Sequence, residues 1–200
     1  MLTYAFPAAR PALAILFRLD ERLGQVVART TEPTIGLIRL AWWRERLEAL
    51  DAAPPPAEPL LAEISTRLVP APGGVALAEL EAGWAALLHA DPLDEAALAE
   101  HARGRGGVLF GLAAGLLGAA DARVGAAGEG WALADFARHV RDETVRRRAE
   151  AMAAARLAGL FAARWPRSLR PLGALAAAAT LPDGSPSRVW RMLAHRLTGR

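Results

Sequence analysis

Apolar residues recur at helical spacing along most of the chain. In the first stretch they fall at Leu13, Leu16, Phe17, Leu23 and Val27. Spacings of three and four residues indicate helices that bury one face, and Asp20 interrupts the apolar face of the first. We find no strand signal. The pattern predicts helices over residues 11–29, 32–52, 60–68, 75–89, 93–117, 129–164, 168–180 and 187–197.

Proline and glycine mark where these helices end or bend. The proline-rich segment 53–59 and the glycine- and alanine-rich segment 118–128 are predicted to be loops. The glycines within 104–107 are expected to kink their helix. A bare stripe recurs every fourth residue at Gly107, Gly111 and Gly115. Such a stripe favours close contact with another helix, although it would equally leave room for a ligand.

The composition supports an all-α fold. The chain has 200 residues, 53% of them hydrophobic, and much of that fraction is alanine and leucine, which form helices readily. This length predicts one domain over residues 1–200, with the loop 53–59 inside it. Cysteine and lysine are both absent. Their absence excludes disulfides, thiolate zinc sites, cysteine nucleophiles, Schiff-base chemistry and a P-loop lysine.

Charge is distributed unevenly although the net charge is only +3. Residues 184–200 contain four arginines and no acid. A basic end can contact anionic lipid, nucleic acid or an acidic partner, or it can be a solvated helix face. The longest uncharged stretch, 106–120, is short of the roughly 20 residues that a spanning helix needs. Without a signal peptide either, we expect a cytoplasmic protein, with peripheral membrane contact left open.

The densest cluster of aromatic and basic residues lies in the second predicted helix. Trp42 and Trp43 point about 100° apart, so one can enter the core while the other lines a cavity or packs on a neighbour. Arg39 and Trp43 are four residues apart and can form a cation–π pair. Alternatively, arginine stems and indoles simply seal a contact between helices.

The run RLAWWR at residues 39–44 resembles the "RL-x-WW-R" segment of the squalene/phytoene synthase family. Residues 101–118 resemble the small-residue helix of that family, residues 130–133 the start of its second functional helix, and residues 197–200 its closing segment. The helical pattern predicts seven or eight helices, and the resemblance implies that they form an isoprenoid-synthase-like bundle in a shortened member. It also implies head-to-head prenyl diphosphate transfer, in which two aspartate-rich motifs hold magnesium across a central cavity.

The first of these motifs is nearly absent from the chain. Two acids four residues apart would place both carboxylates on one helix face, where hard divalent ions can bind them. Asp20 is instead followed four residues later by Gly24, and Glu21 by Gln25.

The second motif is half present. Residues 135–143 align with the family pattern "N-x-x-R-D-x-x-E-D". Asp135 then replaces the asparagine, Arg138 matches the arginine and His139 replaces the first aspartate. Asp142 and Glu143 fall on the final acidic pair. Arg147 lies near the position of the arginine that binds diphosphate in the family.

The acidic pair also has a purely structural interpretation. Asp142 with Arg146, and Glu143 with Arg147, are spaced as ordinary i,i+4 ion pairs on a helix. The histidines at 89, 101, 139 and 195 show no metal-ligand spacing. Arginines 141 and 146–148 lack interleaved exposed aromatics, so we expect no nucleic-acid partner.

These features predict a non-catalytic binding or assembly protein of this family. The family includes such relatives, among them a mitochondrial complex I assembly factor. The alternative is a magnesium-dependent prenyl diphosphate transferase with altered metal ligands. We expect no cofactor unless the protein is active, in which case magnesium is expected; the expected ligand is a prenyl diphosphate or another lipid-like molecule. Candidate residues of the cavity and diphosphate site are Asp20, Arg39, Trp43, Arg138, His139, Asp142, Glu143 and Arg147.

Overall fold

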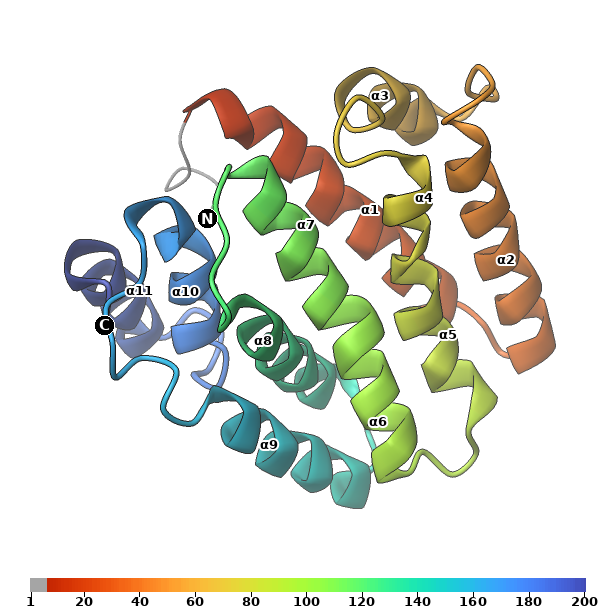
Figure 1. Cartoon of the computed structure of the whole chain (residues 1–200). Coiled ribbons are helices and arrows are strands. Elements are labelled where there is room, and N and C mark those ends of the chain that lie inside the picture. Colours follow the sequence, from red (N-terminus) through yellow and green to blue (C-terminus); the bar gives the residue numbers. More distant parts are fainter. Residues whose placement is uncertain (1–6) are drawn as a thin grey trace.

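The computed structural model describes residues 7–200, and every regular element over that range is a helix (Figure 1). The expected all-α fold is therefore confirmed for this part of the chain. The elements are η2 (Pro7–Ala9), α1 (Arg10–Ala28), α2 (Pro33–Ala49), α3 (Pro59–Arg67), α4 (Gly74–Ala78), α5 (Leu80–His89), α6 (Glu95–His101), the π-helical η3 (Ala102–Gly107), α7 (Val108–Leu116), α8 (Val124–His139), α9 (Glu143–Leu157), η4 (Arg167–Leu169), α10 (Arg170–Ala177) and α11 (Pro186–Thr198). Among residues 7–200, no helix is both long and apolar enough to cross a membrane.

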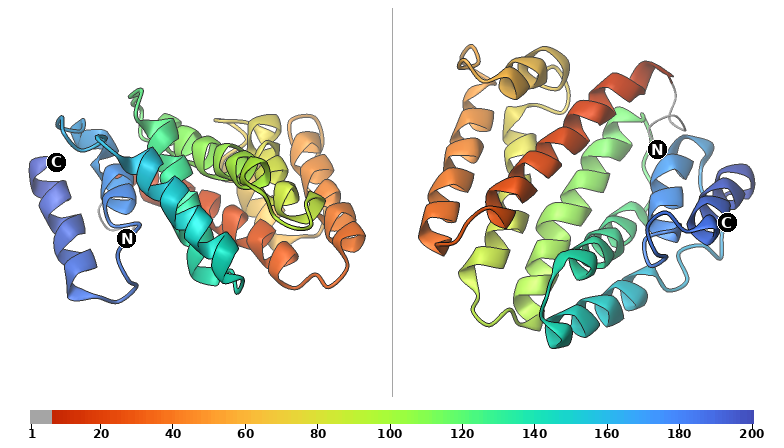
Figure 2. Two further views of the ribbon diagram at one scale, coloured as in Figure 1. Left: turned by 90° about the horizontal axis from the view of Figure 1, so that it is seen from below. Right: turned by 180° about the vertical axis from the view of Figure 1, so that it is seen from behind.

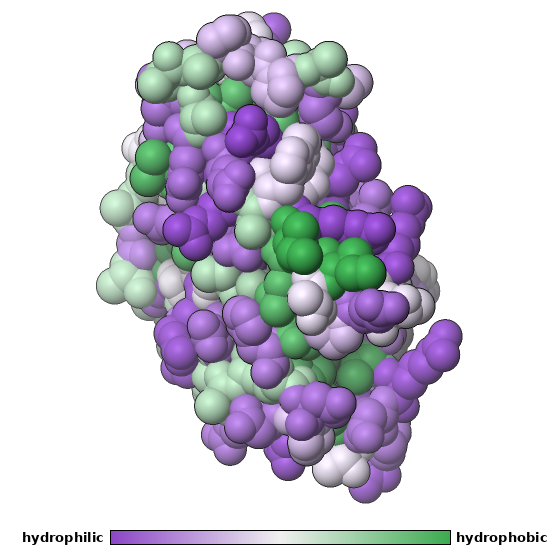
Figure 3. Space-filling model, turned by 90° about the vertical axis from the view of Figure 1, so that its right-hand side faces the viewer, coloured by the Kyte–Doolittle hydropathy of each residue, from purple (hydrophilic) through white to green (hydrophobic). Residues whose placement is uncertain are grey.

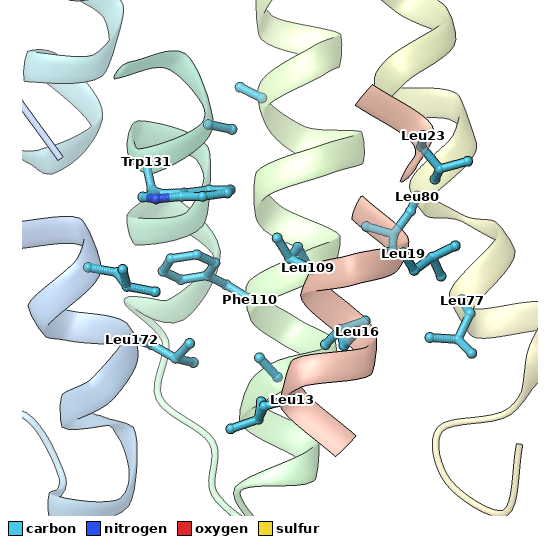
Figure 4. Close-up of a cluster of buried hydrophobic side chains, with 14 of the residues drawn as sticks. Leu13, Leu16, Leu19, Leu23, Leu77, Leu80, Leu109, Phe110, Trp131 and Leu172 are labelled. Atoms are coloured by element: carbon cyan, nitrogen blue, oxygen red, sulfur yellow. The ribbon is translucent and has the colours of Figure 1, made fainter. Parts of the chain in front are cut away.

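Helix α1 lies diagonally across one side of the helices that run from α4 to α7 (Figure 2). It contributes four buried leucines, Leu13, Leu16, Leu19 and Leu23. Figure 4 shows these side chains in one cluster with Leu109 of α7, Leu77 of α4 and Leu80 of α5. Phe110 and Trp131 extend the same core towards α8, with their ring centroids 5.5 Å apart. The apolar face of the first helix thus forms the centre of the core.

Three helices approach closely at glycine contacts around η3. Gly83 of α5 packs against the backbone of Gly104, and Gly106 packs against the backbone of Gly128 in α8. A side chain at any of these positions would overlap a neighbouring backbone atom. The glycines therefore fix η3 tightly between α5 and α8. In place of the expected kink, residues 102–107 form a π-helical turn, and α6, η3 and α7 continue as one rod (Figure 1).

The glycine stripe at 107, 111 and 115 does not make the favoured close helix contact. A Cβ at Gly111 or Gly115 would meet nothing within 4 Å, and one at Gly107 would make only ordinary contact with Glu129. The period of four correctly placed these glycines on one face of a helix. That face is open, and the close contacts are made by glycines outside the stripe.

The predicted long helix over 129–164 is wrong, because the chain breaks at residues 140–142. Val140 is extended, and Asp142 caps α9 by accepting hydrogen bonds from the backbone of Thr144 and Val145 at 2.8 and 2.9 Å. Aspartate is among the best N-caps, and here capping replaces a continued helix. Helix α9 then ends before Gly159, whose φ of +74° is left-handed.

Two further boundaries differ from the sequence expectation. The expected loop over 118–128 is shorter than predicted, because α8 begins at Val124. Helix α8 tolerates its glycines because Gly128 and Gly130 face neighbouring helices, where no side chain would fit. The expected helix over 75–89 is present as α4 and α5, which are separated only at Glu79.

We expect Gly128→Ala to lower the free energy of unfolding by about 2 kcal/mol or more, because its Cβ would overlap the backbone of Gly106. Gly111→Ala should instead raise it by about 0.5–1 kcal/mol, because the new methyl group enters open space within a helix. Urea denaturation of both variants and the parent protein measures the difference. Equal stabilities would show that the α8–η3 contact is looser than described.

Candidate functional site

A buried arginine joins one acid from each of the two motif regions. The Arg105 guanidinium donates to Asp20 of α1 through Nε and one terminal nitrogen, each at 3.0 Å. The same guanidinium lies 2.8 Å from a carboxylate oxygen of Asp135 in α8. Arg105 and Asp20 are both buried, and Asp135 is partly buried. The two carboxylates thus share one fixed internal cation.

Two indole rings enclose the same guanidinium. Its central carbon lies 4.2 Å from the centroid of Trp84 and 4.8 Å from that of Trp131. Trp84 also donates its ring N–H to Asp20 at 3.0 Å. Cation–π contacts are strongest where water is excluded, so both rings stabilise the buried charge. Arg105 is therefore held by two carboxylates and two aromatic faces.

The glycine contacts explain this placement. Trp84 follows Gly83, and Arg105 lies between Gly104 and Gly106. Close approach of the three backbones brings both indoles within reach of the guanidinium.

Charge pairing shifts the pKa values of this group of residues in opposite directions. Burial alone would lower the pKa of Arg105, but the facing Asp20 and Asp135 raise it overall. Burial would likewise raise the pKa of Asp135, and Arg105 and Arg138 hold it below the usual value. Arg105 and Asp135 are therefore both charged at neutral pH.

The ion pairs continue from Asp135 to the surface. Arg138 contacts Asp135 at 2.8 Å and donates to the backbone oxygen of Ala179 at 2.8 Å. It also lies 3.3 Å from Asp183, which pairs with Arg188 of α11 at 2.6 Å. Alternating charges thus connect the buried centre with the last helix.

His101 lies one helical turn before Arg105 and is fully buried. Its Nδ1 is 2.7 Å from the backbone oxygen of Gly83, which can only accept, so the neutral ring holds its proton on Nδ1. The imidazole ring contacts the rings of Trp84 and Phe136, and its Nε2 has no hydrogen-bond partner. Burial and the nearby Arg105 lower the pKa of His101 to about 3. The histidine is therefore neutral in the folded protein.

A cavity of about 570 Å³ opens beside these residues, between α1, α5 and α8. Its polar part is formed by Asp20, Glu21, Gln25, Arg105, Asp135 and His139. Most of the remaining wall is apolar or aromatic: Phe17, Val27, Ala28, Trp84, Leu87, Trp131, Phe136 and Val140. This volume is within the range of small-molecule sites, about 300–1,000 Å³.

The predicted site residues divide between the cavity and the outer surface. Asp20 and His139 line the cavity, and Arg138 supports it through Asp135. Arg39 lies instead at a small separate hollow of about 130 Å³. Trp43 is buried, and the guanidinium over its ring is that of Arg22, at 5.9 Å, in place of the expected Arg39. Trp42 is exposed.

Each member of the acidic pair after the helix break has a structural role, but only Glu143 makes its expected ion pair. Asp142 caps α9 and does not pair with Arg146 as expected. Glu143 pairs with Arg146 and, at 2.7 Å, with Arg147 on the exposed side of α9. None of Asp142, Glu143 and Arg147 lines the cavity. The break at 140–142 separates them from Asp135, because they no longer share its helix.

The carboxylates as arranged do not fit a magnesium cluster. Such a cluster needs several free oxygen ligands. The oxygens of Asp20 instead accept from Arg105 and Trp84, and those of Asp135 face Arg105 and Arg138. A guanidinium within hydrogen-bond distance of both acids also opposes a divalent cation by charge repulsion. Within residues 7–200, no three histidine or acidic side chains converge as a metal ion would require.

The family model for squalene/phytoene synthase matches residues 2–180 of the chain, so the protein belongs to the squalene/phytoene synthase family. The helical architecture over residues 7–200 agrees with the isoprenoid-synthase-like fold implied by the sequence resemblance. Members of the family bind prenyl diphosphates, and active members generally depend on magnesium. No curated protein and no solved structure matches the chain.

Sequence reasoning did not identify Arg105 or its aromatic neighbours as part of the site. Arg105 lies among the glycines that are expected to kink their helix, and Trp84 lies within the helix predicted over residues 75–89. One signal was present: Asp20 interrupts an otherwise apolar stripe, and a buried acid requires a partner. The sequence alone does not show which of 24 arginines that partner is.

We expect Arg105→Met to lower the free energy of unfolding by about 3–5 kcal/mol, because it leaves Asp20 buried without its cation. Arg103→Met, two residues away at an exposed position, should stay within about 0.5 kcal/mol of the parent. Adding Asp20→Asn and Asp135→Asn to Arg105→Met should recover part of the loss, because no charge then remains unpaired. Chemical denaturation tests this order, and an Arg105→Met protein as stable as Arg103→Met would contradict it.

The buried histidines make stability depend on pH. The folded pKa is about 3 for His101 and about 4 for His195, against 6.5 when unfolded. Because the unfolded chain then binds more protons, the stability from each histidine is present above pH 6.5 and declines as the pH falls.

Between about pH 7.5 and about pH 5, the parent should lose about 2 kcal/mol more stability than His101→Gln, which removes one of these groups. His89→Gln, at an exposed position, should keep the full pH dependence of the parent. Urea titrations at both pH values measure the slopes. Identical slopes for all three proteins would mean that His101 is not held neutral.

Proposed function

We propose that this protein is a non-catalytic binding or assembly member of the squalene/phytoene synthase family. The observation that supports this proposal is the placement of Arg105 between Asp20 and Asp135. In active relatives, acids of the two motif regions bind magnesium and, through it, diphosphate. Here a covalently attached cation neutralises the acids that remain. The main means of stabilising a diphosphate leaving group is thereby lost.

The cavity supports a lipid-like ligand bound without a divalent cation. Its wall is mainly aromatic and aliphatic, which favours an elongated apolar chain. The polar end contains three acids and Arg105, whose charge is already satisfied by two of them. A diphosphate there would face the third carboxylate, that of Glu21, and a guanidinium whose charge is already paired. A neutral or weakly polar head group, such as an alcohol, suits this end better.

The alternative is a prenyl diphosphate transferase with altered metal ligands. In this alternative, the carboxylates of Asp20, Asp142 and Glu143 would hold magnesium. Arg138 and Arg147 would bind the phosphate groups of the substrate. Asp20 lies in the cavity, but Asp142 is a helix cap and Glu143 pairs with arginines on α9. This arrangement favours the non-catalytic proposal.

Thermal unfolding with farnesol and with farnesyl diphosphate, each in magnesium or in EDTA, tests the proposal. Farnesol should raise Tm by roughly 5–10 °C at about 100 times its Kd, because it binds only the folded state. Magnesium should not change the shift with either ligand. Product analysis with farnesyl or geranylgeranyl diphosphate should show no turnover near the ordinary enzyme range of about 1–1,000 per second.

Matched variants locate the binding. Ala28→Trp places an indole at the cavity wall and should reduce the farnesol shift. Ala49→Trp makes the same change at the last residue of α2, away from the cavity, and should leave the shift unchanged. Magnesium-dependent product formation would establish the transferase alternative. Equal shifts in both variants would show that the ligand binds elsewhere.

A further inference from the structure

Helix α11 directs an apolar face away from the protein. Val189, Trp190 and Leu197 are 52, 71 and 77% exposed, and Leu193 is half-buried between them in sequence. Their spacing of three and four residues places them on one side of the helix. Surface helices usually turn their apolar side to the core, so this orientation is reversed. Figure 2 shows α11 at the outer edge of the molecule, beside α10.

The inner side of α11 is anchored in the fold. His195 is fully buried, in edge contact with the rings of Phe161 and Trp165, and lies directly against Gly173 of α10. Ser185 caps the first turn, and Gly199 ends the helix in a left-handed conformation. The helix therefore cannot rotate its apolar face inwards without losing the His195 contacts.

The charge around this helix is strongly positive. Residues 164–200 contain seven of the 24 arginines and only one of the 21 acids, Asp183. Their formal charge is +6, which leaves −3 for residues 1–163, because the whole chain is +3. That single acid is paired with Arg138 and Arg188. The uneven charge noted in the sequence is thus concentrated at the end of the molecule that presents α11.

We propose that α11 docks on the surface of an anionic lipid membrane, lying in the plane of the interface. Exposed tryptophan, valine and leucine on one face, flanked by arginines, are typical of helices that insert shallowly between lipid head groups. Tryptophan favours this region in particular, since it has an apolar body and a polar N–H. Anionic lipids attract a region with a net positive charge, and residues 164–200 carry a formal charge of +6.

The same features disfavour a second copy of this chain as the occupant. Two α11 faces would bring together two surfaces of high positive charge, with a single, already paired acid on each. At ordinary salt these charges repel at short range. An anionic lipid surface satisfies both the apolar side chains and the arginines at once.

Two exposed apolar residues on separate helices offer a control at the other edge of the molecule. Ile38 of α2 is 65% exposed and Val75 of α4 is 57% exposed. Figure 3, viewed from the α2 side, shows exposed hydrophobic residues among hydrophilic ones. Residues 32–49 contain three acids and three arginines, so this region lacks the positive excess of α11.

Co-sedimentation of the full chain with vesicles tests the proposal. The protein should bind phosphatidylcholine vesicles that contain phosphatidylglycerol, and binding should fall in high salt and without the anionic lipid. The variant W190S/L197S should bind at least about tenfold more weakly, because it removes two inserted apolar side chains. The variant I38S/V75S should bind as the parent does. Brominated lipid should quench the tryptophan fluorescence of the parent but not that of W190S/L197S.

Three outcomes would overturn the proposal. One is binding that is insensitive to salt and to lipid charge. Another is equal loss of binding in both double variants. The third is an absence of vesicle binding together with a dimer that W190S/L197S dissociates, which would assign the face to a second copy. None of these results bears on the cavity ligand or on turnover, which are measured without vesicles.

Discussion

The buried Arg105 guanidinium imposes the main constraint on this structure. Moving such a charge out of water is strongly unfavourable unless it is paired and hydrogen-bonded. Its partners come from α1, α5 and α8, which lie far apart in sequence, so the charge is satisfied only when these helices pack together. The leucine core supplies the bulk of the burial, whereas Arg105 restricts which arrangement of the helices is acceptable.

This constraint also determines what the cavity can bind. A divalent ion is exchangeable and brings open coordination positions for phosphate oxygens. A guanidinium whose donors are directed to Asp20 and Asp135 offers few further positions, and it leaves only when the protein unfolds. The cavity therefore has an apolar wall and a polar end whose charges are mostly satisfied internally. Retention of a family fold with changed site chemistry is common, because function depends on the site and not on the fold.

The sequence predicted the positions of the helices better than it predicted how the helices end and which of them pack together. Apolar spacing located α1, α2 and α3 to within a few residues, because one-sided burial leaves a local pattern. The break at Asp142 was missed, because the same aspartate can continue a helix or cap the next one, and the choice depends on tertiary packing. The approach of Gly106 to Gly128 was missed for a related reason: the stripe was periodic, whereas the contact is made by single glycines from different helices.

Among the proposed site residues, Asp20 was located by a local signal and Arg105 was not. A polar residue in an apolar stripe is visible in one helix, but its partner 85 residues away is not. The second motif misled in part because an alignment counts residues and takes no account of a helix end between them. Asp142 and Glu143 matched in sequence, yet the turn at 140–142 takes them to another helix.

The π turn at Ala102–Gly107 makes the packing of this rod sensitive to the number of residues in the turn. Each residue of an α-helix rotates the next by about 100°, and the wider turn accommodates one residue more than an α-helical turn does. The side facing α5 and α8, with His101 and Arg105, is thereby set independently of the side with Leu109 and Phe110. Loss of one residue here would rotate His101 and Arg105 by about 100° relative to Leu109 and Phe110. A change in chain length at this turn, without any substitution, is therefore enough to remove the internal cation and expose the two acids.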